Sequence, residues 1–253
     1  MPLHESIDAA GPANAPAIVL VHGSVVSRKM WQPQLRGLSD VYRVLAPDLP
    51  GHGGRATERF TFAAASQVLA DLIEHETPGR ALVVGASLGG YVAVDLAQHF
   101  PERVAGLVLA GASRNFMGVL GVYLRFVGGA MRRGWLQQTR ERAEERTRRM
   151  FPPALAEVAD AQIKAGVFPE TLGPAFAEMA GRDFQLLLAD YPGRTLIVNG
   201  ERDAGPRASA ARFARSARHA EVATIPDAGH ACNLDQPELF NRAVREFAAR
   251  VFG

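Results

Sequence analysis

The chain of 253 residues is 47% hydrophobic and 21% charged, so it has enough apolar sequence for the core of one α/β domain with an insertion. Its formal net charge of +2 is close to balance and implies no general affinity for nucleic acid, and the single cysteine, Cys232, excludes an internal disulfide. The first residues lack a basic start and an apolar signal core, and the apolar stretch at 116–127 is too short to span a bilayer. We therefore expect a cytoplasmic protein without a membrane span.

The first half of the chain alternates short apolar runs with helical patterns. After an expected loop at 9–16, the runs are continuous and β-rich, which is typical of strands inside a parallel sheet that is covered on both faces. The expected strands are 17–21, 43–46, 81–84 and 104–110, and the expected helices are 31–38, 62–75 and 88–100. This alternation predicts an α/β fold with a mostly parallel central sheet, helices on both faces and right-handed crossovers.

From residue 113 to residue 191 the alternation stops and the pattern is helical throughout. We predict an inserted helical lid at 113–191 and a core domain formed by 1–112 and 192–253. Within the lid, 137–149 is charge-dense, and we interpret it as a solvated helix face with i, i+4 ion pairs in preference to a binding patch for an acidic group. Strand and helix patterns resume at 195–198, 208–217, 220–225 and 237–251.

One motif stands at a strand-to-helix junction. The sequence Gly85-Ala86-Ser87-Leu88-Gly89 begins where the apolar run at 81–84 ends, and a helical pattern follows it. A serine at such a sharp turn lies in strained backbone, and the flanking glycines let neighbouring chain pass closely enough to leave its hydroxyl accessible. Ordinary loop glycines would match Gly-x-Ser-x-Gly by accident in about one chain in ten of this length. The strand and the helix around the motif favour a nucleophile.

A serine nucleophile needs a base within hydrogen-bond reach and a group that orients the base. Ser87, Asp203 and His230 each come directly after a predicted parallel strand. Because the carboxyl ends of parallel strands face a common crevice, we expect the three side chains to meet there although they are far apart in the sequence.

The combined motifs resemble the α/β-hydrolase fold superfamily, in its serine esterase or lipase-like branch with a helical lid. In that family the nucleophile, the acid and the histidine follow one another in this order along the chain. The resemblance covers nearly the whole chain from residue 17 onward. The matching segments are Val21-His22-Gly23, Pro50-Gly51-His52-Gly53, Gly85-Ala86-Ser87-Leu88-Gly89, Gly200-Glu201-Arg202-Asp203 and Asp227-Ala228-Gly229-His230.

The resemblance implies a role for each matched residue. Ser87 is the nucleophile, His230 the base and Asp203 the acid, and the backbone N–H groups of Ser24 and Leu88 form the oxyanion hole. No metal or organic cofactor is required. Because fewer than ten residues precede the first loop, we expect one strand fewer than usual at that edge of the sheet.

Other histidines and carboxylates have structural interpretations. We expect His22 to brace the oxyanion loop and His52 to hold the turn after its strand, whereas the remaining four are expected on the surface: His4, His75, His99 and His219. Two carboxylates compete with Asp203 for the acid role. Asp227 is only three residues before His230, and Asp48 precedes the nucleophile, so Asp203 is preferred.

The leading hypothesis is hydrolysis of a small or medium carboxylic ester or lactone by a monomer or homodimer. Ser87 cannot form the alkyl-ester intermediate of relatives that open epoxides or displace halide. Loop 23–27 lacks the Gly-Pro-Gly continuation of relatives that cleave carbon–carbon bonds. Two rival functions stay open: a slow ligand-binding protein or receptor, and a lyase or cofactor-free perhydrolase on the same triad.

The lid offers an apolar pocket for the substrate. The expected lining residues are Phe116, Met117, Tyr123, Phe126 and Trp135. The alternative, that these side chains only pack the lid onto the body, is equally open for each of them.

Overall fold

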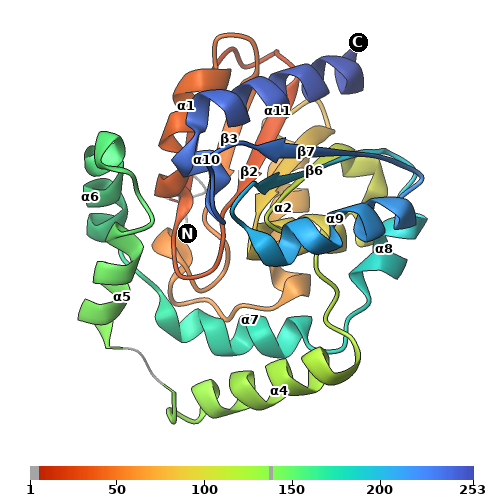
Figure 1. Ribbon diagram of the computed structural model, residues 1–253. Helices are drawn as coiled ribbons and strands as arrows, with labels where there is room; N and C mark the ends of the chain where they lie inside the picture. Colours follow the sequence, from red (N-terminus) through yellow and green to blue (C-terminus); the bar gives the residue numbers. More distant parts are fainter. Residues whose placement is uncertain (1–5, 137–138) are drawn as a thin grey trace.

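A computed structural model describes residues 6–136 and 139–253 of the chain (Figure 1). Within these residues a seven-stranded sheet has the order β1-β3-β2-β4-β5-β6-β7, and β1 is its one antiparallel member. The predicted mostly parallel sheet is therefore confirmed. The strands are β1 (Ile7–Ala10), β2 (Ala17–Val21), β3 (Arg43–Pro47), β4 (Ala81–Ala86), β5 (Val104–Ala110), β6 (Arg194–Gly200) and β7 (His219–Ile225).

The central strands are apolar throughout because both of their faces are buried. Successive side chains of a strand point to opposite faces, so Val19 and Val21 of β2 join one core cluster while Ile18 and Leu20 join the other. All four side chains are 0% exposed. This two-sided burial is the physical reason for the continuous apolar runs in the sequence.

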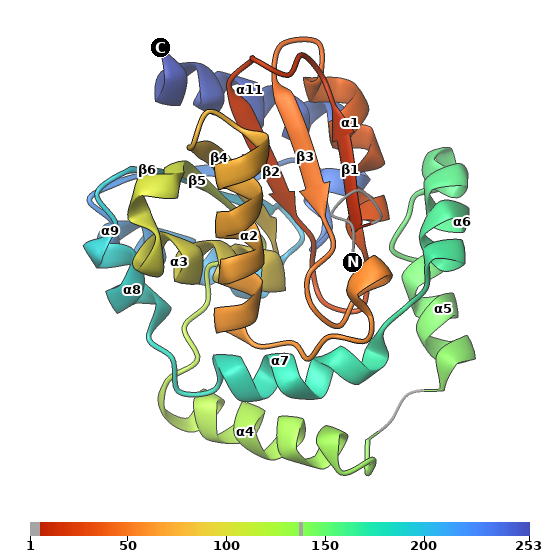
Figure 2. The same ribbon diagram turned by 180° about the vertical axis from the view of Figure 1, so that it is seen from behind.

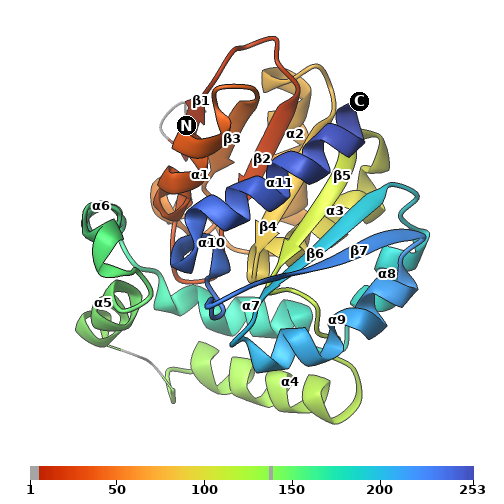
Figure 3. The same ribbon diagram turned by 45° about the horizontal axis from the view of Figure 1, so that its top comes forward.

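Helices cover both faces of the sheet (Figures 1, 2 and 3). The helices of this core are α1 (Gln32–Leu38), α2 (Phe62–Glu76), α3 (Leu88–His99), α9 (Ala204–Ser216), α10 (Cys232–Asp235) and α11 (Pro237–Phe252). The core cluster on one face includes side chains of α2, α3 and α9, and the cluster on the other face includes side chains of α1, α10 and α11. Short 3₁₀ turns lie at Arg28–Trp31, Gly53–Arg55, Pro101–Arg103, Pro153–Leu155 and Pro169–Thr171.

Two predicted boundaries are wrong. The expected loop at 9–16 starts too early, because residues 9 and 10 belong to β1, which pairs with β3 through Ala10 and Val44. A four-residue edge strand is too short for its alternation to be recognised. The helix expected from residue 208 begins at Ala204, since Pro206 stands in its first turn, where a proline costs no intrahelical hydrogen bond.

Between β5 and β6 the described residues form helices and no strand. These helices are α4 (Gly118–Arg132), α5 (Arg140–Arg148), α6 (Ala156–Ala165), α7 (Leu172–Met179) and α8 (Phe184–Asp190). We call this part of the chain, residues 113–191, the helical insertion. In Figures 1 and 2, α7 lies between α4 and the sheet, while α5 and α6 stand together to one side. The insertion thus adds a layer beyond one end of the sheet.

The charge-dense stretch is a solvated helix over most of its length. Of the predicted range 137–149, residues 137 and 138 lie outside the described residues, and α5 covers most of the rest. Arg140 and Glu144 form an exposed i, i+4 ion pair at 3.1 Å, and Glu145 pairs with Arg149 in the same way. None of the described helices is both long enough and apolar enough to cross a membrane.

Candidate active site

Ser87 occupies the sharp turn between β4 and α3. Its φ of 50° and ψ of −116° lie outside the regions that L-residues favour, so the surrounding structure must hold it there. The turn is tight: a Cβ on Gly89 would lie 2.2 Å from the carbonyl oxygen of Val21, and one on Gly85 would lie 2.3 Å from the carbonyl oxygen of Gly89. Glycine at these two positions lets the chain pass close to the serine.

Three side chains from separate strand ends meet at this turn. His230, in the loop after β7, has its Nε2 atom 3.1 Å from Oγ of Ser87 and its Nδ1 atom 2.7 Å from Oδ2 of Asp203, which follows β6. Because a carboxylate only accepts hydrogen bonds, Nδ1 carries the proton and Nε2 is left to accept the hydroxyl proton of Ser87. This arrangement can activate a serine hydroxyl.

Neither of the two competing carboxylates contacts His230 within the described chain. Asp48 is buried in an ion pair with Arg28 and accepts a hydrogen bond from the N–H of Gly54 at 2.8 Å. Asp227 bonds to Glu201 and Arg202 through its backbone. Asp203 is therefore the carboxylate in position to orient the imidazole.

The two expected oxyanion donors lie beside Ser87. Ser24 and Leu88 both line the cavity that contains the serine hydroxyl, and a Cβ on Gly23 would lie 3.6 Å from Cβ of Ser87. Leu88 is the first residue of α3, so its N–H has no acceptor within the helix. Among the described residues, neither N–H donates to a protein group. Both are thus free to bind a developing negative oxygen.

Two other histidines are buried and support the loops around the site. His22 accepts a hydrogen bond from the N–H of Leu49 at Nε2, 3.0 Å away, and its Nδ1 donates to the carbonyl of Gly23 at 2.7 Å. His52 donates from Nδ1 to the carbonyl of Pro50 at 3.0 Å, and the two rings meet edge to face at 4.8 Å. Burial lowers the pKa of His22 to about 4 and that of His52 to about 3, so both rings are neutral. These contacts match the structural roles expected for them.

The other predicted surface histidines are exposed where they are described. These are His75, His99 and His219, whereas His4 lies outside the described residues.

Ser87 lines two cavities, of about 350 Å³ and about 520 Å³. The residues common to both are Ser24, Ser87, Phe176 and His230. The smaller cavity is further lined by Tyr91, Arg114, Phe116, Leu124, Met179 and Asp203, and the larger by Met30, Tyr123, Met131, Arg146, Met150 and Leu172, among others. Their volumes are in the range of small-molecule sites.

Two of the five expected lining residues lie at the cavities: Phe116 lines the smaller cavity and Tyr123 the larger one. Met117, Phe126 and Trp135 line neither cavity and are 47%, 70% and 72% exposed. Met117 and Trp135 flank the ends of α4, and Phe126 lies on an exposed side of that helix. We therefore remove these three from the candidate pocket.

Phe176 of α7 was missed by sequence reasoning, although it stands where the two cavities meet. Its neighbours Leu172 and Met179, which also line the cavities, share its face at helical spacing. That spacing is a usable signal, but it does not by itself tell a cavity wall from a packing face.

Comparisons with known proteins bear on the family and the fold of the chain. A family model described as "Alpha/beta hydrolase family" matches residues 18–243. A pimeloyl-[acyl-carrier protein] methyl ester esterase of Aromatoleum aromaticum is 31% identical over 247 residues, which cover 89% of this chain and 95% of that protein. A thermophilic esterase from Thermogutta terrifontis superposes with a TM-score of 0.78 at 29% identity, covering 98% of this chain and 94% of that one. MenH from S. aureus has a TM-score of 0.83 at 18% identity, with 98% and 99% covered, which shows the shared fold alone.

Proposed function

The chain belongs to the alpha/beta hydrolase family, and on that premise we propose that it hydrolyses small to medium carboxylic esters or lactones through an acyl-enzyme on Ser87. The observation that carries the proposal is the hydrogen-bonded line from Oγ of Ser87 to His230, at 3.1 Å, and from His230 to Asp203, at 2.7 Å. The esterase names of the Aromatoleum relative and the Thermogutta neighbour support a carboxylic ester as the bond that is cleaved.

In the acylation step, Oγ of Ser87 attacks the carbonyl carbon of the ester while Nε2 of His230 takes the hydroxyl proton. The carbonyl oxygen becomes an oxyanion in the tetrahedral intermediate. When the intermediate collapses, the carbon–oxygen bond to the leaving alcohol breaks and His230 gives the alcohol its proton. Asp203 keeps the proton on Nδ1 and stabilises the transient imidazolium. A water molecule then repeats the cycle on the acyl-enzyme and releases the acid.

The backbone N–H groups of Leu88 and Ser24 would bind the oxyanion. Both belong to segments whose conformation is set before substrate arrives: the first turn of α3 and the loop after β2. Donors fixed in advance need no reorganisation during the reaction, and one such donor lowers the barrier by roughly 3 kcal/mol in measured cases.

The two cavities suit the two parts of an ester. Because Ser87 lines both, one cavity would hold the acyl part and the other the alcohol part of the substrate. The helical insertion (113–191) would act as a lid on the core formed by 1–112 and 192–253, since Phe116, Tyr123 and Phe176 come from it. Most of the remaining lining is aliphatic or aromatic, which favours substrates with apolar chains.

A panel of aryl esters of graded acyl length tests the proposal on the native protein and on Ser87→Ala. We expect hydrolysis by the native protein and a loss of at least a thousandfold in kcat/KM for the variant. Hydrolysis that stays within threefold of native after the substitution would refute the role of Ser87. Stoichiometric labelling of Ser87 by a fluorophosphonate without steady-state turnover would point instead to a ligand-binding protein. Peracid or aldehyde in excess of acid would point to perhydrolase or lyase chemistry.

A further inference from the structure

The loop that carries Ser24 has an unfavourable backbone. It follows β2 and runs to the 3₁₀ turn at Arg28–Trp31. Val25 has a φ of 71°, in the left-handed region, where a β-branched side chain is strongly disfavoured. Contacts with neighbouring segments must therefore hold this loop in shape.

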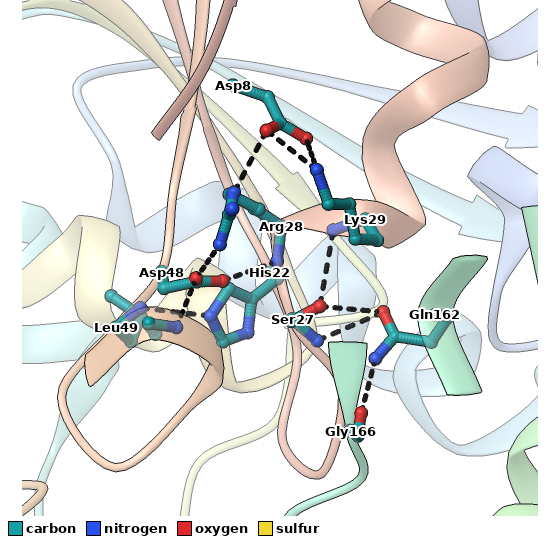
Figure 4. Close-up of polar contacts among 10 residues, drawn as sticks. Asp8, His22, Ser27, Arg28, Lys29, Asp48, Leu49, Gln162 and Gly166 are labelled. Carbon is teal, nitrogen blue, oxygen red and sulfur yellow. Dashed lines mark hydrogen bonds and ion pairs between the residues drawn. The ribbon is translucent and has the colours of Figure 1, made fainter. Parts of the chain in front are cut away.

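The core of the protein holds one side of the loop (Figure 4). At its start, His22 accepts the N–H of Leu49. At its end, the buried carboxylate of Asp48 accepts the N–H of Arg28 at 2.9 Å and pairs with the guanidinium of the same residue. Asp8 of β1 also bonds to Nε of Arg28, at 2.9 Å. The loop is thus anchored at its start to the segment that follows β3, and at its end to that segment and to β1.

The helical insertion holds the other side. Oε1 of Gln162, on α6, accepts both the N–H and the Oγ–H of Ser27, each at 3.1 Å (Figure 4). Nε2 of Gln162 donates to the carbonyl of Gly166 at 2.8 Å. The N–H of Phe168 donates to the carbonyl of Val25 at 2.8 Å, in an isolated β-bridge. The insertion therefore contacts the strained residue itself and also Ser27, two positions after it.

The chemistry of Gln162 suits this position closely. Its side chain is fully buried, and the N–H of Ser27 can only donate while the carbonyl of Gly166 can only accept, so the amide orientation is determined by its partners. Loss of the amide would leave buried donors and an acceptor unpaired. One side chain thus joins the turn after α6 to the loop beside Ser87.

Building on the proposed function, we propose that Gln162 is a positioning residue for the oxyanion hole. By holding Ser27, and together with the Phe168 N–H on Val25, it keeps the N–H of Ser24 aimed at the oxyanion. The hole is then complete only while residues 162–168 of the insertion are docked on the loop. Substrate binding in the ground state does not need this donor, whereas the tetrahedral intermediate does.

Gln162→Met tests the proposal because it keeps the length of the side chain and removes its amide. We expect kcat for an aryl ester to fall at least tenfold with KM within threefold of native. The affinity of an aryl trifluoromethyl ketone, whose serine adduct places an oxyanion in the hole, should fall by the same factor as kcat/KM. A purely structural role for Gln162 would not link these two losses.

Asn115→Leu is the matched control. Asn115 is an amide in the same insertion, with Oδ1 accepting the N–H of Phe184 at 2.9 Å and Nδ2 donating to Asp183 at 2.8 Å, and it does not contact the loop. We expect it to lower the thermal midpoint while leaving kcat and ketone affinity within threefold of native. The proposal is overturned if folded Gln162→Met behaves like this control. The proposed function is tested separately, by turnover of the aryl ester by the native protein and loss of both turnover and ketone binding in Ser87→Ala.

Ser27→Ala is a second variant that preserves the fold more closely, since it removes one of the two hydrogen bonds to Gln162 and keeps the backbone bond. We expect a smaller loss in kcat in the same direction. Both substitutions break the hydrogen bond between Oγ of Ser27 and Oε1 of Gln162, although Ser27→Ala also removes the acceptor of the Lys29 N–H. The double variant should therefore lose less in kcat than the two single losses combined. Additive losses would contradict the shared contact.

Discussion

Lowering the pH from 7 to 5 should destabilise the fold through two buried imidazoles. His22 and His52 are both 0% exposed, and burial lowers their pKa values from 6.5 to about 4 and about 3. In the unfolded chain both rings would titrate near 6.5. Below that pH the unfolded state binds more protons than the folded state, so stability falls as the pH falls, until it approaches the folded pKa values.

The magnitude follows from the same values. At pH 5 the unfolded histidines are almost fully protonated and the folded ones are still neutral. Because pH 5 lies about 1.5 units below the unfolded pKa, and one unit is worth about 1.4 kcal/mol, each ring removes about 2 kcal/mol of stability. The two together remove about 4 kcal/mol, a large part of the 5–15 kcal/mol that is typical of a folded protein.

Urea denaturation followed by circular dichroism at pH 7 and pH 5 measures this loss. His52→Phe is the informative variant, since the ring packs edge to face against Phe60 and Phe168 and an apolar ring preserves those contacts. The difference in unfolding free energy between the two pH values should be about 2 kcal/mol smaller in the variant than in the native protein. An equal pH dependence for both proteins would refute the reasoning.

Three further predictions concern Asp203 and two glycines, Gly89 and Gly129. Asp203→Asn should lower kcat roughly ten-thousandfold with little change in KM, because an amide N–H facing Nδ1 of His230 favours the wrong tautomer; steady-state kinetics checks this, and a loss below tenfold would contradict it. Gly89→Ala should destabilise the protein by at least about 3 kcal/mol in urea denaturation, because its Cβ would lie 2.2 Å from the backbone oxygen of Val21. Gly129→Ala, within α4, meets only the flexible end of Arg133 and should instead stabilise by up to about 1 kcal/mol.

Two features could be predicted from the sequence: the parallel sheet, and the convergence of Ser87, Asp203 and His230. Each prediction has its own physical reason. A strand buried on both faces must be apolar at every position, so β2 and β4 are visible as uninterrupted runs. Parallel strands end at a common edge, so residues that follow β4, β6 and β7 are expected to converge. Ser87, Asp203 and His230 occupy such positions, so the sequence alone makes them candidates for the catalytic triad.

The lining of the cavities could not be foreseen in the same way. The first half of the insertion is apolar on several sides, and the pattern alone does not say which face of α4 packs toward Ser87. Tyr123 lines a cavity although it is 61% exposed, whereas Trp135, also aromatic, is 72% exposed and lines neither cavity. The position of α7 against α4 decides this, and that position depends on packing between helices distant from the motifs.

The sequence by itself therefore determined the α/β class and the parallel strands, because burial on both faces leaves uninterrupted apolar runs in the chain, and it placed the candidate catalytic residues directly after three of these strands. Only the tertiary structure decided which groups hold the loop beside Ser87. The contact between Ser27 and Gln162 joins a loop of the core to a helix of the insertion, and neither residue belongs to a motif. A hydrogen bond between two such residues depends on how the segments dock, and docking leaves no pattern in either segment alone.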